Sequence, residues 1–252
     1  ELPPLSAMDE DWDWAATKSL AHDLLSQVGL ANAGAGRHIL RGLIEGHARP
    51  ILESSEPGLN VPEILSATWR RYDRLEAGLP VAETMGAMLT THLAALTLAV
   101  HESLVAQGLS PQVGRRIVYD IGWSIYERMS EVPLVLAKTL TSNPEKQMRI
   151  ATDLFRQFPF GGPAYGWRDV DAGPNIVGFD CTKCPVAEFF RRHDATELCV
   201  QTWCALDYPL AQKWGGHLER NGTIAMGKDR CDFRWHIDAA GASIPTKIKA
   251  DA

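Results

Sequence analysis

The chain of 252 residues lacks several features that would fix its class of function. It has no uninterrupted apolar run of about eighteen residues, the length that a helix needs to cross a bilayer. It has no basic block, and its 25 Lys and Arg are outnumbered by 31 Asp and Glu, which gives a formal net charge of −6. The attraction that supplies most nucleic-acid affinity is therefore missing. Residues 1–4 show neither the charged nor the apolar part of a secretory signal. Because the first residue is not Met, the sequence leaves open whether a leader segment preceded it. We expect a soluble cytoplasmic protein that binds neither membranes nor nucleic acids.

Familiar catalytic motifs are also missing. The sequence contains no HExxH zinc motif, Walker loop, GxSxG elbow or GxGxxG fingerprint. The small residues at 29–36 lack the Gly-Lys-Ser/Thr ending of a phosphate loop and are interpreted as a helix–helix connection. His22, His92 and His101 fall on apolar helical patterns, where a histidine is more often part of the core than a ligand.

Up to about residue 158 the apolar residues recur at helical spacing, and Gly and Pro mostly mark the joints. This periodicity predicts a helical N-terminal layer over residues 1–158. The expected helices are residues 9–28, 37–52, 61–79, 81–107, 111–140 with a kink near Pro133, and 143–158.

The pattern then changes. Residues 159–174 are rich in Gly and Pro and predict a linker. Residues 175–238 predict a smaller cysteine-rich α/β unit with a short antiparallel sheet, and residues 239–252 a flexible tail. Within that unit we expect a strand at 175–182, helices at 184–192, 196–204 and 209–214, and a hairpin of strands 217–226 and 231–237. The fold class is therefore α+β, with the parts joined in one integrated domain.

All five cysteines lie between residues 181 and 231, and the odd number argues against a disulfide scaffold and for a reducing cytoplasm. Cys184 directly precedes Pro185 at a predicted helix start, where the positive end of the helix dipole favours a thiolate. A small buried apolar thiol is the equal alternative. Cys181 and Cys184 have the CxxC spacing of a zinc or redox pair, but Cys199 and Cys204 complete it only loosely. We expect no cofactor, with zinc as the alternative.

Carboxylates and arginines accompany these thiols. Glu188 follows Cys184 by one helical turn, and Asp207 follows Cys204 by three residues, which places each pair on one face of a helix. Arginine can hold a substrate carboxylate through two hydrogen bonds. The commoner role of a single arginine is to pair, at the surface, with an acidic residue of a neighbouring strand. The candidate catalytic residues are Cys184, Asp207, Cys204, Cys231 and Glu188, and the candidate substrate-binding residues are Arg220, Thr223, Asp232, Arg234 and Trp235.

The order of these motifs resembles the L-2-amino-thiazoline-4-carboxylate hydrolase family. The resemblance covers residues 175–235 and is carried by CPVAEFF (184–190), WCALD (203–207), LERNGTIAMG (218–227) and CDFRW (231–235). It implies a hydrolase that opens a small ring, in the family a cyclic isothiourea. Cys184, Cys204 and Cys231 fall on cysteine positions of the family, whereas Cys181 and Cys199 look peculiar to this sequence.

Ring opening of an amidine-like carbon needs a nucleophile, a proton donor and a grip on the substrate. We assign Cys184 as the nucleophile, with Cys204 or Cys231 as alternatives, and Asp207 as the acid/base, assisted by Glu188. The substrate is expected to be a small cyclic amidine, amide or ketone. The rival hypothesis is a metal-binding or ligand-binding sensor that uses the cysteine cluster without turnover. A third is a metal hydrolase with Cys, Asp and His217 or His236 as ligands. Whether the chain forms a homo-oligomer stays open.

Overall fold

The structure, a computed structural model, describes residues 33–238. The predicted helix at 9–28 and the predicted tail at 239–252 lie outside the described residues. The helices of the first part are α2 (Ala33–Ser55), α3 (Val61–Glu76), α4 (Met85–Ala106), α5 (Pro111–Met129), α6 (Glu131–Leu140) and α7 (Pro144–Gln157). The second part contains α8 (Pro185–Arg192), α9 (Thr196–Gln201), α10 (Asp207–Lys213), the 3-10 turns η2 (Cys204–Leu206) and η3 (Ile224–Met226), and four strands.

The helix boundaries follow from capping side chains. Asn60, Thr84, Ser110 and Asn143 each accept a backbone N–H in the first turn of α3, α4, α5 and α7. Three of these helices also begin with a proline in the first turn, where its missing N–H costs no hydrogen bond. The long helix predicted at 111–140 is divided at Ser130 into α5 and α6.

The four strands form one antiparallel sheet in the order β1 (Gly166–Val170), β2 (Ile176–Lys183), β4 (Cys231–Ile237), β3 (Gly216–Glu219). Residues 231, 233 and 235 of β4 are buried and the alternate residues are more exposed, as expected of a sheet with one covered face. The α+β fold class is thus confirmed.

Two details of the sheet differ from the prediction. The Gly/Pro-rich segment contains β1, which pairs with β2. The expected strand over 217–226 ends at Glu219, and residues 220–230 leave the sheet. The reason is that the Asp232 carboxylate accepts the backbone N–H groups of Asn221 and Gly222, which replaces ladder bonds. Thr223 then caps the turn η3 through the N–H of Met226.

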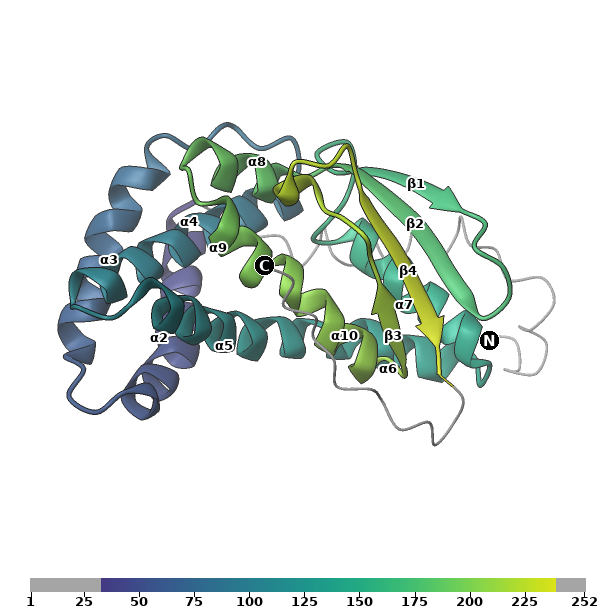
Figure 1. The fold of residues 1–252 in the computed structure, drawn as a ribbon, viewed down its shortest axis with the longest axis horizontal. Coiled ribbons are helices and arrows are strands. Elements are labelled where there is room, and N and C mark those ends of the chain that lie inside the picture. Colours follow the sequence, from purple (N-terminus) through teal and green to yellow (C-terminus); the bar gives the residue numbers. More distant parts are fainter. Residues whose placement is uncertain (1–32, 239–252) are drawn as a thin grey trace.

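Two buried clusters make up most of the core. One lies among α2 to α5, α8 and α9, and the other lies between the covered face of the sheet and α6, α7 and α10 (Figure 1). Cys184 packs against both clusters and against a third, smaller one around Tyr165. Helix α4 is long and apolar enough to cross a membrane, but 61% of its most apolar window is buried inside the protein.

Candidate active site

A cavity of about 170 Å³ lies where the two core clusters meet. Its walls come from α4, α5, α7, the buried face of the sheet and the segment between α8 and β4. Most lining side chains are aliphatic or aromatic. The polar lining residues are few, as is usual for a small-molecule site. All five cysteines line this cavity: Cys181, Cys184, Cys199, Cys204 and Cys231.

One buried ion pair supplies charge to the cavity wall. Arg220 Nη1 donates to Asp207 Oδ2 at 2.7 Å, and the two side chains are only 4% and 15% exposed. Arg220 Nη2 also donates to the carbonyl of Cys204, and the Tyr126 hydroxyl donates to Asp207 Oδ1. Burial raises the pKa of Asp207, although Arg220 opposes the shift. A carboxyl group whose pKa is raised is suited to exchange a proton with a ligand.

Cys231 is the thiol that its surroundings favour as a thiolate. It faces Cys181 across the β2–β4 pair, and its Sγ accepts the backbone N–H of Ile224 at 3.2 Å. The hydrogen bond from Cys181 lowers the pKa of Cys231, and the Ile224 N–H and the Arg220 charge act in the same direction. The Lys183 carbonyl, 3.2 Å from Cys181 Sγ, is a second possible acceptor for the Cys181 thiol proton.

Cys184 occupies the expected position but not the expected electrostatic environment. It is the N-cap of α8, and its Sγ accepts the Ala187 N–H at 3.4 Å. Burial nevertheless raises its pKa to about 12, and nearby Cys231 and Cys204 add to that shift. The helix terminus does supply backbone N–H groups that lower the pKa of this thiol, as expected, but burial outweighs them and favours the alternative of a buried neutral thiol.

Cys199 and Cys204 form a second thiol pair, between α9 and the turn η2. The hydrogen bond with Cys204 raises the pKa of Cys199, and burial adds to the shift. Cys181 and Cys199, which look peculiar to this sequence, are thus hydrogen-bond partners of two candidate catalytic residues, Cys231 and Cys204.

Glu188 and Thr223 do not line the cavity. The Glu188 carboxylate lies on the surface and accepts hydrogen bonds from Arg191 and Arg192, which lower its pKa. Glu188 does not share a helix face with Cys184, because Cys184 is the N-cap with an extended backbone and helical spacing begins only after it. Thr223 is buried, and its hydroxyl caps η3.

The substrate-binding candidates on β4 divide between the two faces of the sheet. Trp235 lies on the covered face and lines the cavity, whereas Asp232 and Arg234 lie on the other face. Arg234 pairs there with Asp180, and hydrogen bonds from Arg168 and Arg234 lower the pKa of that buried carboxyl despite its desolvation. Asp232 and Arg234 therefore have structural partners outside the cavity, as strand alternation requires.

Three contributors to the cavity were missed. Tyr126 on α5 is buried against Asp207, and burial raises its pKa well above the ordinary value. Arg156 on α7 lies over the Phe179 ring at 4.4 Å, and its Nε is buried without a hydrogen-bond partner. Tyr165 bonds to Thr90 in the cavity wall. Each lies on an element distant in sequence from the cysteines, so no local spacing could have identified it.

The candidate metal-hydrolase ligands are not brought together. His217 and His236 lie on the outer face of the sheet, whereas the thiols and Asp207 lie at the cavity. Within residues 33–238, the group with metal-ligand geometry is His217, Glu219 and His236, without any cysteine.

Comparison with known proteins supports the resemblance noted in the sequence. The family model for L-2-amino-thiazoline-4-carboxylic acid hydrolase matches residues 134–235, from within α6 to near the end of β4. The resemblance is confirmed, and it begins earlier than predicted. No curated protein and no solved structure matches the chain. The family name implies a hydrolase that acts on a thiazoline carboxylic acid.

Proposed function

We propose, from the family match over residues 134–235, that this protein is a thiol-dependent hydrolase that opens a small ring inside the cavity. One observation carries the proposal: the buried Asp207–Arg220 pair and the Cys231 thiol, whose Sγ accepts the Ile224 N–H, line the same cavity. Perturbed titratable groups that gather in one pocket are a recognised sign of an active site.

The proposed nucleophile is Cys231 rather than Cys184, since its pKa is lowered while that of Cys184 is raised to about 12. The thiolate adds to the ring carbon that lies between two heteroatoms. The bond from that carbon to the leaving heteroatom breaks, and Asp207 donates to that heteroatom the proton that it has taken from the Cys231 thiol. Water then hydrolyses the thiol-bound intermediate, restores the thiolate, and returns a proton to Asp207.

Two buried donors are available for a substrate. Arg156 Nε and Trp235 Nε1 are both buried without hydrogen-bond partners, and both residues line the cavity. An unpaired buried donor costs about 1–3 kcal/mol, which a bound acceptor would remove. We assign an oxygen of the substrate carboxylate to Arg156 Nε, assisted by Trp235, in place of Arg234; the two Nη groups of Arg156 already pair with Asp153 and Asp169. Arg220 orients Asp207 and lies close enough to Cys231 to favour its thiolate.

A second function is supported by the apolar character of the remaining wall. A pocket lined mainly by aliphatic and aromatic side chains also suits a protein that holds an apolar ligand without turnover. Both functions place a small molecule in the same cavity, and the assay below separates them. We further propose a reducing, intracellular location, which the five free cysteines support.

The test is whether the purified protein opens the ring of L-2-amino-thiazoline-4-carboxylate, measured as the loss of the ring's absorbance. A panel of small cyclic amidines, amides and ketones extends the assay. Cys231→Ser should lower kcat by more than about 1,000-fold. Asp207→Asn should remove from the pH profile of kcat the part that titration of this carboxyl group causes. Arg156→Gln should mainly raise KM for substrates that carry a carboxylate.

Glu188→Gln serves as the comparison variant, because Glu188 lies outside the cavity. It should retain the activity of the parent protein. Full activity in all the single Cys→Ser variants would remove thiol chemistry from the proposal. Binding of panel members without turnover would favour the ligand-binding function.

A further inference from the structure

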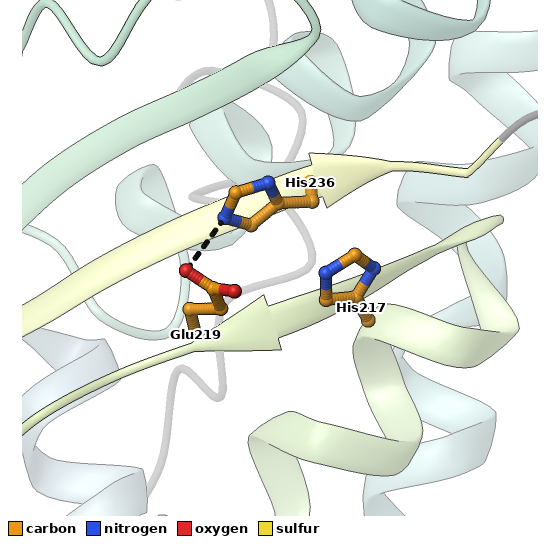
Figure 2. A group of neighbouring side chains, drawn as sticks. All are labelled: His217, Glu219 and His236. Atoms are coloured by element: carbon orange, nitrogen blue, oxygen red, sulfur yellow. Dashed lines mark ion pairs between the residues drawn. The ribbon is translucent and has the colours of Figure 1, made fainter. Parts of the chain in front are cut away.

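Two histidines and a glutamate lie together on the outer face of the β3–β4 pair (Figure 2). One potential ligand atom from each of His217, Glu219 and His236 lies within 4.8 Å of the other two. We propose that these residues bind a divalent transition-metal ion, with zinc as the expected occupant. This site is separate from the cavity and independent of the function proposed above.

Strand pairing holds the three side chains in place. His217 and His236 are direct partners across the β3–β4 pair, and their rings stack with centroids 4.7 Å apart and planes 8° apart. Glu219 follows His217 by two residues and therefore lies on the same face. Because the backbone positions are fixed by the sheet, binding needs only small side-chain movements.

His217 has the hydrogen bond that commonly prepares a histidine for a metal. Its Nδ1 lies 2.6 Å from Asp238 Oδ1, and a carboxylate can only accept, so Nδ1 carries the proton. The lone pair of a neutral ring is then on Nε2. A carboxylate behind a ligating histidine fixes the tautomer and raises the basicity of the ligand nitrogen.

His236 lacks a satisfying partner for its Nε2. This atom is buried and makes no hydrogen bond of acceptable geometry, although Glu219 Oε2 lies 3.2 Å away. In the tautomer that carries its proton on Nδ1, the Nε2 lone pair faces this carboxylate oxygen, and the two repel unless a cation lies between them. The other tautomer directs an Nε2–H donor toward Glu219, a contact of small value because Glu219 is 67% exposed. A bound metal ion would satisfy both atoms and His217 together.

The donor set indicates the class of metal. Two imidazole nitrogens and one carboxylate oxygen are a common ligand set for zinc, with water in the fourth position. Cys231 and Trp235 point to the covered face of the sheet and His236 to the other. The ion would therefore join β3 to β4 and to Asp238, without reaching the thiols of the cavity.

Cobalt(II) titration of the full chain tests the site, because cobalt reports its ligands by absorption. The expected spectrum has d–d bands without a thiolate-to-metal charge-transfer band. His236→Gln and Glu219→Gln should each weaken binding more than about 10-fold, and Asp238→Asn should weaken it about 10–100-fold, as outer-shell changes do. Zinc should raise the thermal midpoint of the parent protein but not that of His236→Gln.

His193→Gln is the matched control, since this exposed histidine lies at the end of α8 and outside the cluster. It should bind cobalt as the parent does. A charge-transfer band would show that the thiols hold the metal, and unchanged affinity in Glu219→Gln would exclude the carboxylate; either result overturns the proposal. Because Glu219 is largely exposed, its variant carries the test even where His236→Gln fails to fold.

Discussion

At the scale of single residues, the Asp207–Arg220 pair is the most consequential contact at the cavity. Removal of one partner from a buried ion pair leaves an uncompensated charge, at a cost of about 3–5 kcal/mol. We therefore expect Arg220→Met to lower the free energy of unfolding by about that amount, measured by urea denaturation. Arg191→Met, at an exposed ion pair, should change it by less than about 1 kcal/mol.

The double variant Asp207→Leu with Arg220→Met should recover most of that loss, because neither charge then remains buried. The two single changes would be strongly non-additive, as expected of residues in contact. Additive losses would show that the pair is not coupled in the folded protein.

The thiols also differ enough to be separated by alkylation. The pKa of Cys231 is lowered by its bond from Cys181, whereas burial raises the pKa of Cys184 to about 12. Only the thiolate reacts with iodoacetamide, so Cys231 should be modified before Cys184 at neutral pH. Mass spectrometry of a labelling time course measures the order. Earlier labelling of Cys184 would contradict both the assignment and the proposed nucleophile.

At the scale of elements, helices were predicted well because their signals are local. A capping side chain and an early proline mark the starts of α3, α5 and α7 in the sequence itself. Strand β1 was missed because its five residues lie among turn formers and take their structure from pairing with β2. The prediction of the hairpin was wrong for a related reason. The Asp232 side chain competes for the backbone N–H groups that would pair the two strands, and no alternation pattern reveals this competition.

The contact between α4 and the Gly/Pro-rich segment provides an element-scale test. A Cβ at Gly86 would clash with the backbone carbonyl of Pro159, in the segment that closes the cavity. Gly86→Ala should therefore lower the free energy of unfolding by about 1–3 kcal/mol, because backbone must move to admit the methyl group. Gly46→Ala, in the exposed interior of α2 with nothing within 4 Å, should instead raise it by up to about 1 kcal/mol. Equal effects in thermal or urea denaturation would contradict this explanation.

At the scale of the whole molecule, the cavity exists because two cores meet. The cysteine-rich segment could be identified from its composition, and it does supply all five thiols and both members of the Asp207–Arg220 ion pair. Tyr126 and Arg156 come from helices that reach the site only through tertiary packing, so sequence spacing gave no sign of them. Likewise Glu188 and Arg234 look equivalent to cavity residues until the strand and helix faces are known.

The same burial predicts how the stability of the molecule depends on alkaline pH. In the folded state the pKa of Cys184 is raised from 9.0 to about 12 by burial, and those of Cys181 and Cys199 are raised by hydrogen bonds to neighbouring thiols and by burial. Above pH 9.0 the unfolded chain releases these protons while the folded chain keeps them, so a rising pH favours unfolding. The contribution of Cys184 is present below pH 9.0 and is lost progressively as the pH rises toward about 12.

Thermal midpoints measured in the presence of a reductant should therefore fall as the pH rises above 9.0. Cys184→Ala gives the matched comparison, because its midpoint should fall less steeply whatever its value at neutral pH. Comparison of slopes separates the titration from the packing lost with the thiol. The lowered pKa of Cys231 acts in a different pH range: its folded form releases a proton below pH 9.0, before the unfolded chain does, so its contribution is complete by about that pH and does not add to the fall. The same slope in the parent protein and in Cys184→Ala would mean that this thiol does not control the alkaline limit of the fold.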